Sequence, residues 1–283
     1  MSAVDRPVNF SATDLTTCTF ETVNVDSNGE IIVRQSGSAP CLTQTLNPEI
    51  SLDLMLIPGG TFMMGDGRHH PDEQPIHQVT VPSFYIGKYA ITQAQYRWVL
   101  GDNLDVGVGA DYPIDQINWH DALAFCSKLS QQTGREYMLP TESQWEYACR
   151  AHTATNFHYG DTITPDLVNY NGEYPYQGAP IGQNRAQATP VGTFPPNGFG
   201  LYDMHGNVWE WCLDPYQPNY QTAPSDGSAV ADSSSLAGNS KRVMRGGAWD
   251  YVAKGCRSAV RCSLDPDLRL AGCGFRVVLG AID

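Results

Sequence analysis

Residues 198–211 read GFGLYDMHGNVWEW, and this stretch typifies the part of the chain that decides the fold class. From Asn156 onward the start signals of helices vanish, and Gly, Pro, Asn and Tyr dominate. Such a composition predicts short strands joined by turns. Charged residues make up only 17% of the 283 residues, which is also typical of a turn-rich protein and not of a helical bundle.

The first half of the chain carries the helix signals. A helix start is favoured by an N-cap side chain that accepts a hydrogen bond from a backbone N–H of the first turn. A Glu or Gln three residues later completes a capping box and strengthens the signal. Together with the strand-rich remainder, these helices indicate an α+β protein. The first expected helix, 93–101, begins with the capping box of Thr92 and Gln95, and the third, 142–151, with that of Thr141 and Gln144. The second, 119–131, has Asn118 as its N-cap, and Gly134 prevents its continuation.

Alternating residues predict a β-hairpin near the N-terminus. Residues 18–25 and 30–34 alternate on either side of an Asn28-Gly29 turn. Further strands are expected at 52–57, 61–64 and 78–81, with a solvated loop at 66–75 and a mobile one at 220–239. No linker divides the chain, so we expect residues 1–45 to form an N-terminal extension with the hairpin and 46–283 to form one domain.

Charge and hydropathy exclude several partners. The formal net charge is -13, and no run of Lys or Arg stands out, so neither a nucleic acid nor an anionic membrane is an expected partner. No stretch approaches the ~20 apolar residues that span a bilayer, and the first residues lack a secretory signal. We therefore expect a cytoplasmic protein whose eight cysteines are buried free thiols.

Several long motifs resemble one family in order along the chain. They cover about residues 52–278 and are 56–65, 84–96, 139–148, 198–211, Arg245-Gly-Gly-Ala-Trp249 and Gly274-Phe-Arg276. The chain is similar in these motifs to formylglycine-generating enzymes, also called sulfatase-modifying factors. The resemblance implies an α+β fold of the C-type-lectin-like, formylglycine-generating-enzyme type, with little regular secondary structure.

The resemblance also raises an enzymatic alternative. Members of the family oxidise a client cysteine with copper and two thiols, which lie five residues apart before an Ala-Ala-Arg-like element. Here that element is Ala259-Val260-Arg261; only Cys256 precedes it, the second thiol falls near Ser258, and Cys262 follows it. Because the thiol pair is displaced, we expect no copper and no enzyme activity.

Calcium is the metal that the resemblance implies. One set comprises Asp203, Gly206, Val208 and Glu210, and a second comprises Asn169 and Tyr170. The acidic partner of the second set falls near Gln183, which is neutral, so this set is the weaker one. A separate group of metal-ligand types, His69, His70, Asp72, Glu73 and His77, lacks a spacing that would orient it and is interpreted as a solvated loop.

The C-terminal segment, residues 243–278, resembles the variable region of target proteins of diversity-generating retroelements. Within a regular frame, the remaining positions show neither helical nor strand periodicity, and none carries Lys, Glu, Gln, Met or Trp, which randomised Asn codons cannot encode. We expect these positions to contact a ligand. They are Asp250, Tyr251, Val252, Gly255, Val260, Cys262, Ser263, Leu264, Asp265, Leu268, Leu270, Ala271, Gly272 and Cys273.

The sequence thus predicts a binding protein that displays a diversified surface, with a protein ligand bound through residues 250–273. If exposed, an apolar patch would be formed by Tyr251, Val252, Leu264, Leu268 and Leu270. Such a patch is typical of protein-binding sites. Two alternatives stay open: a copper-dependent formylglycine-generating oxidase, and an accessory module that docks onto a signalling protein.

Overall fold

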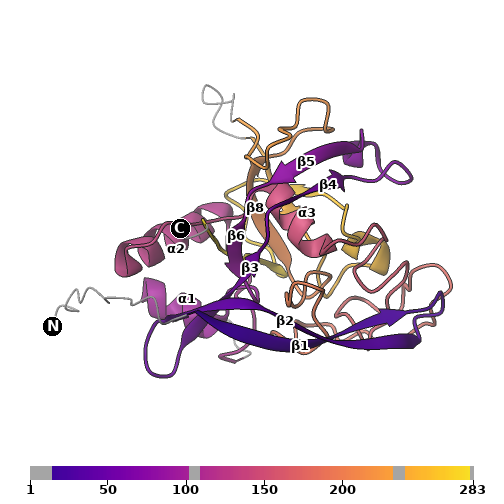
Figure 1. Cartoon of the computed structure of the whole chain (residues 1–283), viewed down its shortest axis with the longest axis horizontal. Helices are drawn as coiled ribbons and strands as arrows, with labels where there is room; N and C mark the ends of the chain where they lie inside the picture. The colour runs from indigo at the N-terminus through magenta and orange to yellow at the C-terminus, as the bar shows by residue number, and fades with distance from the viewer. Residues whose placement is uncertain (1–14, 102–108, 232–239, 281–283) are drawn as a thin grey trace.

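The computed structural model describes residues 15–101, 109–231 and 240–280. Its largest sheet has six strands (Figure 1). In spatial order these are β1 (Leu15–Val25), β2 (Ile31–Thr45), β3 (Ser51–Ile57), β6 (Phe84–Gly87), β12 (Val278–Gly280) and β7 (Tyr137–Met138). The last described strand of the chain therefore pairs with β6 and β7, so the described ends of the domain share one sheet.

The expected hairpin at the N-terminus is present and longer than predicted. Strands β1 and β2 pair antiparallel along their length, and Gly29 takes a positive φ of 87° in the turn. The Asp26 carboxylate accepts hydrogen bonds from the N–H groups of Asn28 and Glu30, which stabilises that turn. Because β2 also pairs with β3, the hairpin continues the main sheet. Where an extension ends and the domain begins stays a prediction.

Two smaller sheets complete the β structure. A four-stranded sheet has the order β10 (Cys262–Leu264), β9 (Arg242–Arg245), β8 (Trp209–Pro215) and β11 (Cys273–Gly274). Strands β4 (Gly60–Met64) and β5 (His77–Val81) form a separate pair. The short lengths of β9, β10 and β11 agree with the turn-rich composition of this half of the chain.

The three expected helices form where the capping signals place them. They are α1 (Gln93–Leu100), α2 (Trp119–Thr133) and α3 (Glu142–Arg150), and each begins with a capping box. Glycines 101 and 134 end the first two in the left-handed conformation, which costs glycine nothing. Helix α3 ends instead at Ala151, with a φ of 44°. It lies between the β4–β5 pair and β8 in Figure 1.

The hydrophobic core has three parts. One lies around α1 and α2, and a second joins α3 to β3, β5 and β6. The third is smaller and joins Val23 and Val25 of the hairpin to Phe157, Tyr176 and Cys256. This third part connects the N-terminal hairpin to the C-terminal segment.

Two expected solvated loops are solvated only in part, because each also buries some of its residues. In the first, Asp66 and Glu73 are buried, and residues Pro71–Glu73 form a 3-10 turn, η2. In the second, Tyr220 is buried, and its hydroxyl donates to Glu142 Oε1 at 3.0 Å. Ser225 also accepts a backbone hydrogen bond from Thr80 of β5. Polar composition was misleading here because these groups find partners inside the protein; residues 232–239 lie outside the described part.

No helix within the described residues is long and apolar enough to cross a membrane. The cytoplasmic location stays a prediction.

Candidate functional site

The C-terminal segment leaves β9 through Gly246 and Gly247, both with positive φ, and forms the 3-10 turn η3 (Ala253–Cys256) before β10. A side chain at Gly247 would collide with Cys256, since an added Cβ would lie 2.5 Å from its sulfur. The tight path therefore requires glycine at this point. In Figure 1 this segment, drawn in yellow, runs beside α3.

Most of the predicted ligand-contacting positions reach the surface. Asp250, Tyr251, Val252, Leu268, Leu270 and Ala271 are exposed, and Gly255, Val260, Cys262, Ser263, Leu264 and Asp265 are half-buried. The ring of Tyr251 packs edge-on against buried Trp209 at a centroid distance of 4.9 Å. Tyr251 therefore presents an exposed but supported aromatic side chain.

Two of the predicted positions, Gly272 and Cys273, are buried and cannot contact a ligand at the surface. The N–H of Gly272 donates to Asp115 Oδ2 at 2.8 Å, and its carbonyl accepts from Trp209. Cys273 pairs with Trp209 in the parallel β11–β8 contact. Irregular spacing in the sequence could not separate these two from their exposed neighbours, because their burial depends on pairing with a distant strand.

Four buried arginines hold the segment from below. Each is matched by a buried glutamate from another part of the chain, and such charges are tolerated inside a protein only when they are paired. The pairs are Arg245–Glu146, Arg257–Glu73, Arg261–Glu142 and Arg276–Glu210. We call these four pairs the arginine frame.

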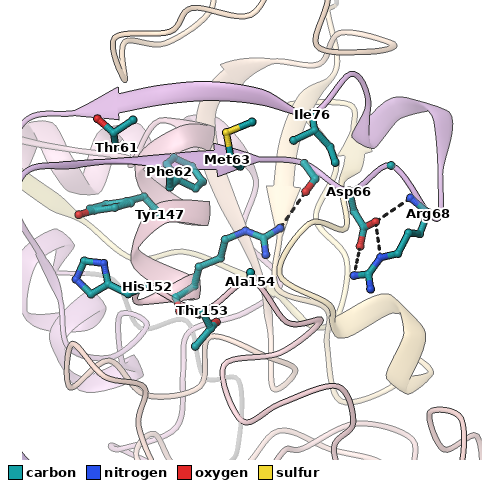
Figure 2. Close-up of a pocket in the computed structure, with 13 residues that line it drawn as sticks. Thr61, Phe62, Met63, Asp66, Arg68, Ile76, Tyr147, His152, Thr153 and Ala154 are labelled. Atoms are coloured by element: carbon teal, nitrogen blue, oxygen red, sulfur yellow. Dashed lines mark hydrogen bonds and ion pairs between the residues drawn. The ribbon is translucent and has the colours of Figure 1, made fainter.

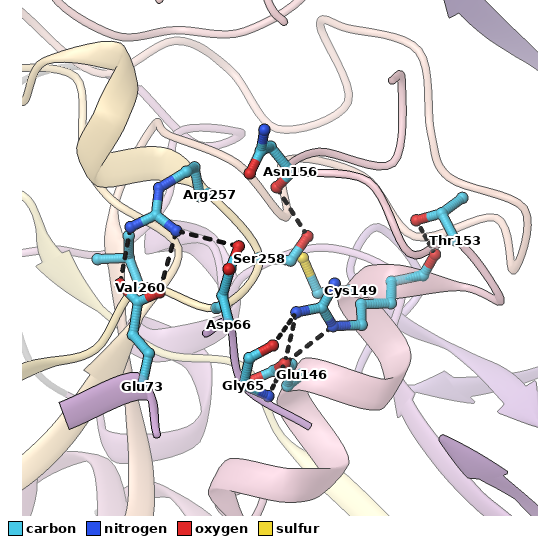
Figure 3. Close-up of polar contacts among 12 residues, drawn as sticks. Gly65, Asp66, Glu73, Glu146, Cys149, Thr153, Asn156, Arg257, Ser258 and Val260 are labelled. Carbon is cyan, nitrogen blue, oxygen red and sulfur yellow. Dashed lines mark hydrogen bonds and ion pairs between the residues drawn. The ribbon is translucent and has the colours of Figure 1, made fainter. Parts of the chain in front are cut away.

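The pair of Arg257 and Glu73 shows how the frame works (Figure 3). Two parallel hydrogen bonds, 3.0 and 2.7 Å long, join the guanidinium to the carboxylate. A second carboxylate oxygen, Asp66 Oδ2, lies 3.8 Å from Arg257 Nη1. Next to it, the Ser258 hydroxyl and N–H both donate to the Asn156 carbonyl. The residues between the candidate positions are thus fixed to η2 and to the loop after α3.

Arg245 and Arg261 fix the same segment to α3. Arg245 pairs with Glu146 and also donates to the carbonyls of Ser258 and Ala259. Arg261 donates to both oxygens of Glu142, at 2.7 and 2.9 Å. Sequence reasoning found α3 by its capping box but missed its two inward carboxylates, because a Glu in a helix is usually solvated.

The thiols of the enzymatic alternative lie in an apolar setting. All eight cysteines are free; Cys18 and Cys262 are half-buried, and the others are buried, as expected for most of them. Burial raises the pKa of Cys256 to about 12, and it also raises the pKa of Cys262. A raised pKa keeps sulfur protonated at neutral pH, whereas a copper ligand or nucleophile needs the thiolate.

The first calcium set is only partly free to bind a cation. Asp203 Oδ1 is buried and lacks a hydrogen-bond partner among the described residues, and burial raises the pKa of this carboxyl to about 6. The Glu210 carboxylate, by contrast, accepts two hydrogen bonds from Arg276, at 2.6 and 2.7 Å, and one from Trp145. As Arg276 already neutralises the charge of Glu210, Asp203 is the carboxylate of this set that is left for a cation, and calcium stays a prediction.

The second calcium set is linked to the loop of the first through Asn207. The Asn169 carbonyl accepts from the N–H of Asn207, and the Asn169 amide donates to Asn207 Oδ1 at 3.1 Å. Asn169 Oδ1 has no partner within the described ranges. Tyr170 is buried, and its hydroxyl donates to the Ile163 carbonyl at 3.3 Å. None of these contacts involves a carboxylate, and calcium at this second set too stays a prediction.

The histidine-rich loop does not assemble a metal centre. In the described part of the chain, no group of three or more His, Cys, Asp or Glu side chains is placed to hold a metal ion. His69 lies 3.8 Å from Asp66, while Glu73 is taken by Arg257. The sequence interpretation as a simple solvated loop was nevertheless incomplete, since the loop supplies part of the arginine frame.

A cavity that the sequence did not indicate lies between β4 and the end of α3 (Figure 2). Its volume is about 470 Å³, and Phe62, Met63, Ile76 and Tyr147 give it apolar walls. The polar side chains at its edge are already engaged, since Arg68 makes two hydrogen bonds to Asp66. Its lining residues come from three stretches of the chain, 61–68, Ile76 and 147–154, so only the folded structure brings them together.

Comparison with known proteins is consistent across sequence and structure. Residues 44–281 match the family of sulfatase-modifying factor enzyme 1-like domains. A formylglycine-generating enzyme of Mycobacterium tuberculosis is 28% identical over 298 residues, which cover 80% of this chain and 97% of that protein. A chaperone protein, LppX of Paenibacillus barcinonensis, is 29% identical over 261 residues, covering 77% and 86%.

Two solved structures have the same fold. PvdO from Pseudomonas aeruginosa superposes with a TM-score of 0.73 and 29% identity, over 85% of this chain and 98% of PvdO. Variable protein 1 of Treponema denticola gives 0.70 and 22% identity, over 85% and 99%. The expected α+β, C-type-lectin-like fold of the formylglycine-generating-enzyme type is confirmed.

Proposed function

Because this chain belongs to the sulfatase-modifying factor enzyme 1-like family, we propose that it uses the family's fold as a rigid support for a ligand-binding surface. The surface consists of the exposed and half-buried candidate positions between Asp250 and Ala271. It binds a protein ligand by complementarity, and no bond is made or broken. Which ligand the surface binds depends on the side chains at those positions.

One observation carries the proposal: burial separates the two kinds of position within a single irregular segment. The motif residues around the candidate positions, Cys256–Ala259, Arg261 and Phe275, are buried, whereas twelve of the fourteen candidate positions are at least partly exposed. A surface of this kind accepts substitutions without loss of the fold, since exposed changes away from special contacts alter stability by less than about 0.5 kcal/mol. Rigid support beneath changeable contacts is also how antibody loops work.

The alternative of a formylglycine-generating oxidase keeps one argument, the similarity to enzymes of that name. Two features speak against it: Cys256 is buried, and the position where the family has its second thiol falls near Ser258. Copper(I) titration tests it: a tight copper complex that is lost in Cys256→Ser and in Cys262→Ser would favour the oxidase over the binding protein.

The proposal itself is tested first in the DNA around the gene. We expect a near-copy of the stretch encoding residues 243–278, differing almost only where the copy has adenine, beside a reverse transcriptase gene. Its presence would support diversification. If no such copy exists, the diversified-surface proposal fails, and the chain returns to the oxidase alternative.

A protein-level test is to randomise the exposed candidate positions in one library and the buried motif residues Cys256–Ala259, Arg261 and Phe275 in another. We expect most members of the first library to fold, as measured by resistance to protease on the surface of yeast, and few of the second. Equal tolerance in the two libraries would contradict the separation of surface from frame.

A further inference from the structure

A second, separate chain segment lies against the proposed ligand surface. The N–H of Asn171 donates to the Tyr251 carbonyl at 2.9 Å, and the N–H of Ala253 donates to the Tyr174 carbonyl at 3.3 Å. These two backbone hydrogen bonds hold residues 171–174 beside residues 251–253. Tyr174 therefore borders Tyr251 and Val252 although 77 residues separate Tyr174 from Tyr251 in the sequence.

The neighbouring segment exposes apolar side chains of its own. Tyr174 is 58% exposed and Ile181 is 76% exposed, compared with 42% for Tyr251 and 39% for Val252. Ile181 is brought close by the next residue, since the N–H of Gly182 donates to the Gly172 carbonyl at 2.9 Å. Together these side chains extend the apolar patch beyond the C-terminal segment, and such patches usually mark a binding surface.

The segment is anchored and does not depend on the candidate positions' side chains. Asn171 Oδ1 accepts from the N–H of Glu173, and buried Tyr176 packs edge-on against Phe157 with ring centroids 5.3 Å apart. The contacts with residues 251 and 253 use backbone atoms alone. Tyr174 and Ile181 would therefore keep their places whatever side chains stand at Tyr251 and Val252.

The charge of this region indicates the partner's chemistry. The carboxylates of Glu173 and Asp250 are both exposed beside the apolar side chains, and the whole chain carries a net charge of -13. Lys254 is exposed here too, whereas Arg269 pairs with Asp121 and Asp267 Oδ1 lies 3.4 Å from His120 Nε2, so the carboxylates of Glu173 and Asp250 outnumber the one cation beside the patch. A partner that offers Lys or Arg next to apolar side chains matches this surface in both charge and polarity.

We propose that Tyr174 and Ile181 form a constant half of the ligand surface, which contacts every ligand, while the candidate positions between Asp250 and Ala271 form the changeable half. The partner is a protein segment that carries basic residues among apolar ones. This inference rests on the proposed function. It adds that affinity has a component independent of the changeable residues.

The experiment uses peptides as defined probes. A random dodecapeptide library displayed on phage is selected against the full chain, and the most enriched peptides are synthesised with a fluorophore. Their Kd is measured by fluorescence anisotropy for the wild type and for Tyr174→Ala, Ile181→Ser and Tyr251→Ala. The matched control is Ile32→Ser, since Ile32 is also an exposed isoleucine, at 64%, but lies on the β1–β2 hairpin.

We expect the enriched peptides to carry net positive charge with apolar residues, and all three surface variants to weaken binding about fivefold or more. Ile32→Ser should leave Kd unchanged. Loss of binding in Tyr251→Ala alone would overturn the constant half but leave the proposed function. Unchanged binding in all three surface variants, or no enriched peptide, would count against both.

Discussion

The hairpin of β1 and β2 and the segment from Arg245 to Arg276 are held in place by different forces. The hairpin is a regular antiparallel ladder whose backbone groups satisfy one another. The C-terminal segment has only short strands, and buried arginine–glutamate pairs supply much of what a ladder would. The difference teaches that an irregular chain can be fixed firmly when its inward side chains are charged and matched. Such a chain leaves its outward side chains free to vary.

The largest effect should come from breaking one pair of the arginine frame. Arg257→Ala leaves the Glu73 carboxylate buried without its cation, which costs about 3–5 kcal/mol of unfolding free energy. Urea unfolding followed by tryptophan fluorescence measures the loss. The control is Arg34→Ala, which removes an exposed hairpin pair with Glu21 and should cost less than about 1 kcal/mol. Similar losses in both variants would erase the contrast between the two regions.

A pH series should weaken the C-terminal region through a buried histidine. His158 stacks on His205, whose Nδ1 lies 2.7 Å from the Cys256 carbonyl, and neither ring nitrogen of His158 has a partner in the described residues. Burial lowers the pKa of His158 well below its ordinary value of 6.5. The unfolded chain therefore binds a proton that the folded chain does not, and stability falls as the pH drops below 6.5.

The variant His158→Phe isolates this contribution. Relative to it, the wild type should lose up to ~1.4 kcal/mol for each unit of pH below 6.5. Burial raises the pKa of Asp203 to about 6 and of Asp214 to about 7, which has the opposite effect on stability, but both proteins share these groups. Parallel stability curves for the two proteins would show that His158 does not titrate in this way.

A calcium ion bound at Asp203 would be a further ionic interaction that the β1–β2 hairpin lacks. A site that binds only the folded protein adds about 1.4 kcal/mol at a tenfold excess of calcium over its Kd. We expect calcium chloride to raise the thermal midpoint of the wild type, compared with EDTA, and not that of Asp203→Asn. The same midpoint with calcium and with EDTA in the wild type would dismiss the first predicted calcium set.

The smallest effect should come from the surface itself. Leu270→Ala removes an exposed side chain and should change the unfolding free energy by less than about 0.5 kcal/mol. Phe275→Ala, five residues on and fully buried, should cost about 3–5 kcal/mol. Chemical denaturation of the two variants measures both. A large cost at Leu270 would mean that this position belongs to the core and not to a ligand surface.

Local signals predicted the regular elements well, because each depends on neighbouring residues. The capping boxes of Thr92 and Thr141 and the turn at Gly29 act over two to four residues, so the sequence shows them directly. The same reasoning failed for Glu73 and Tyr220, which look solvated in sequence. Their partners, Arg257 and Glu142, lie far away along the chain, and no local pattern reports such a contact.

For the site, the sequence predicted the candidate positions: the motifs fixed in spacing around Arg245 and Phe275 leave Asp250 to Cys273 as a patternless interval. Only the tertiary structure decided which of these face outward. Strand β8 pairs with Gly272 and Cys273, while Tyr251 and Ala253 form backbone hydrogen bonds with Asn171 and Tyr174 of another segment. The physical reason is that exposure is a property of packing between distant segments, whereas capping, turn formation and motif spacing are properties of the chain itself.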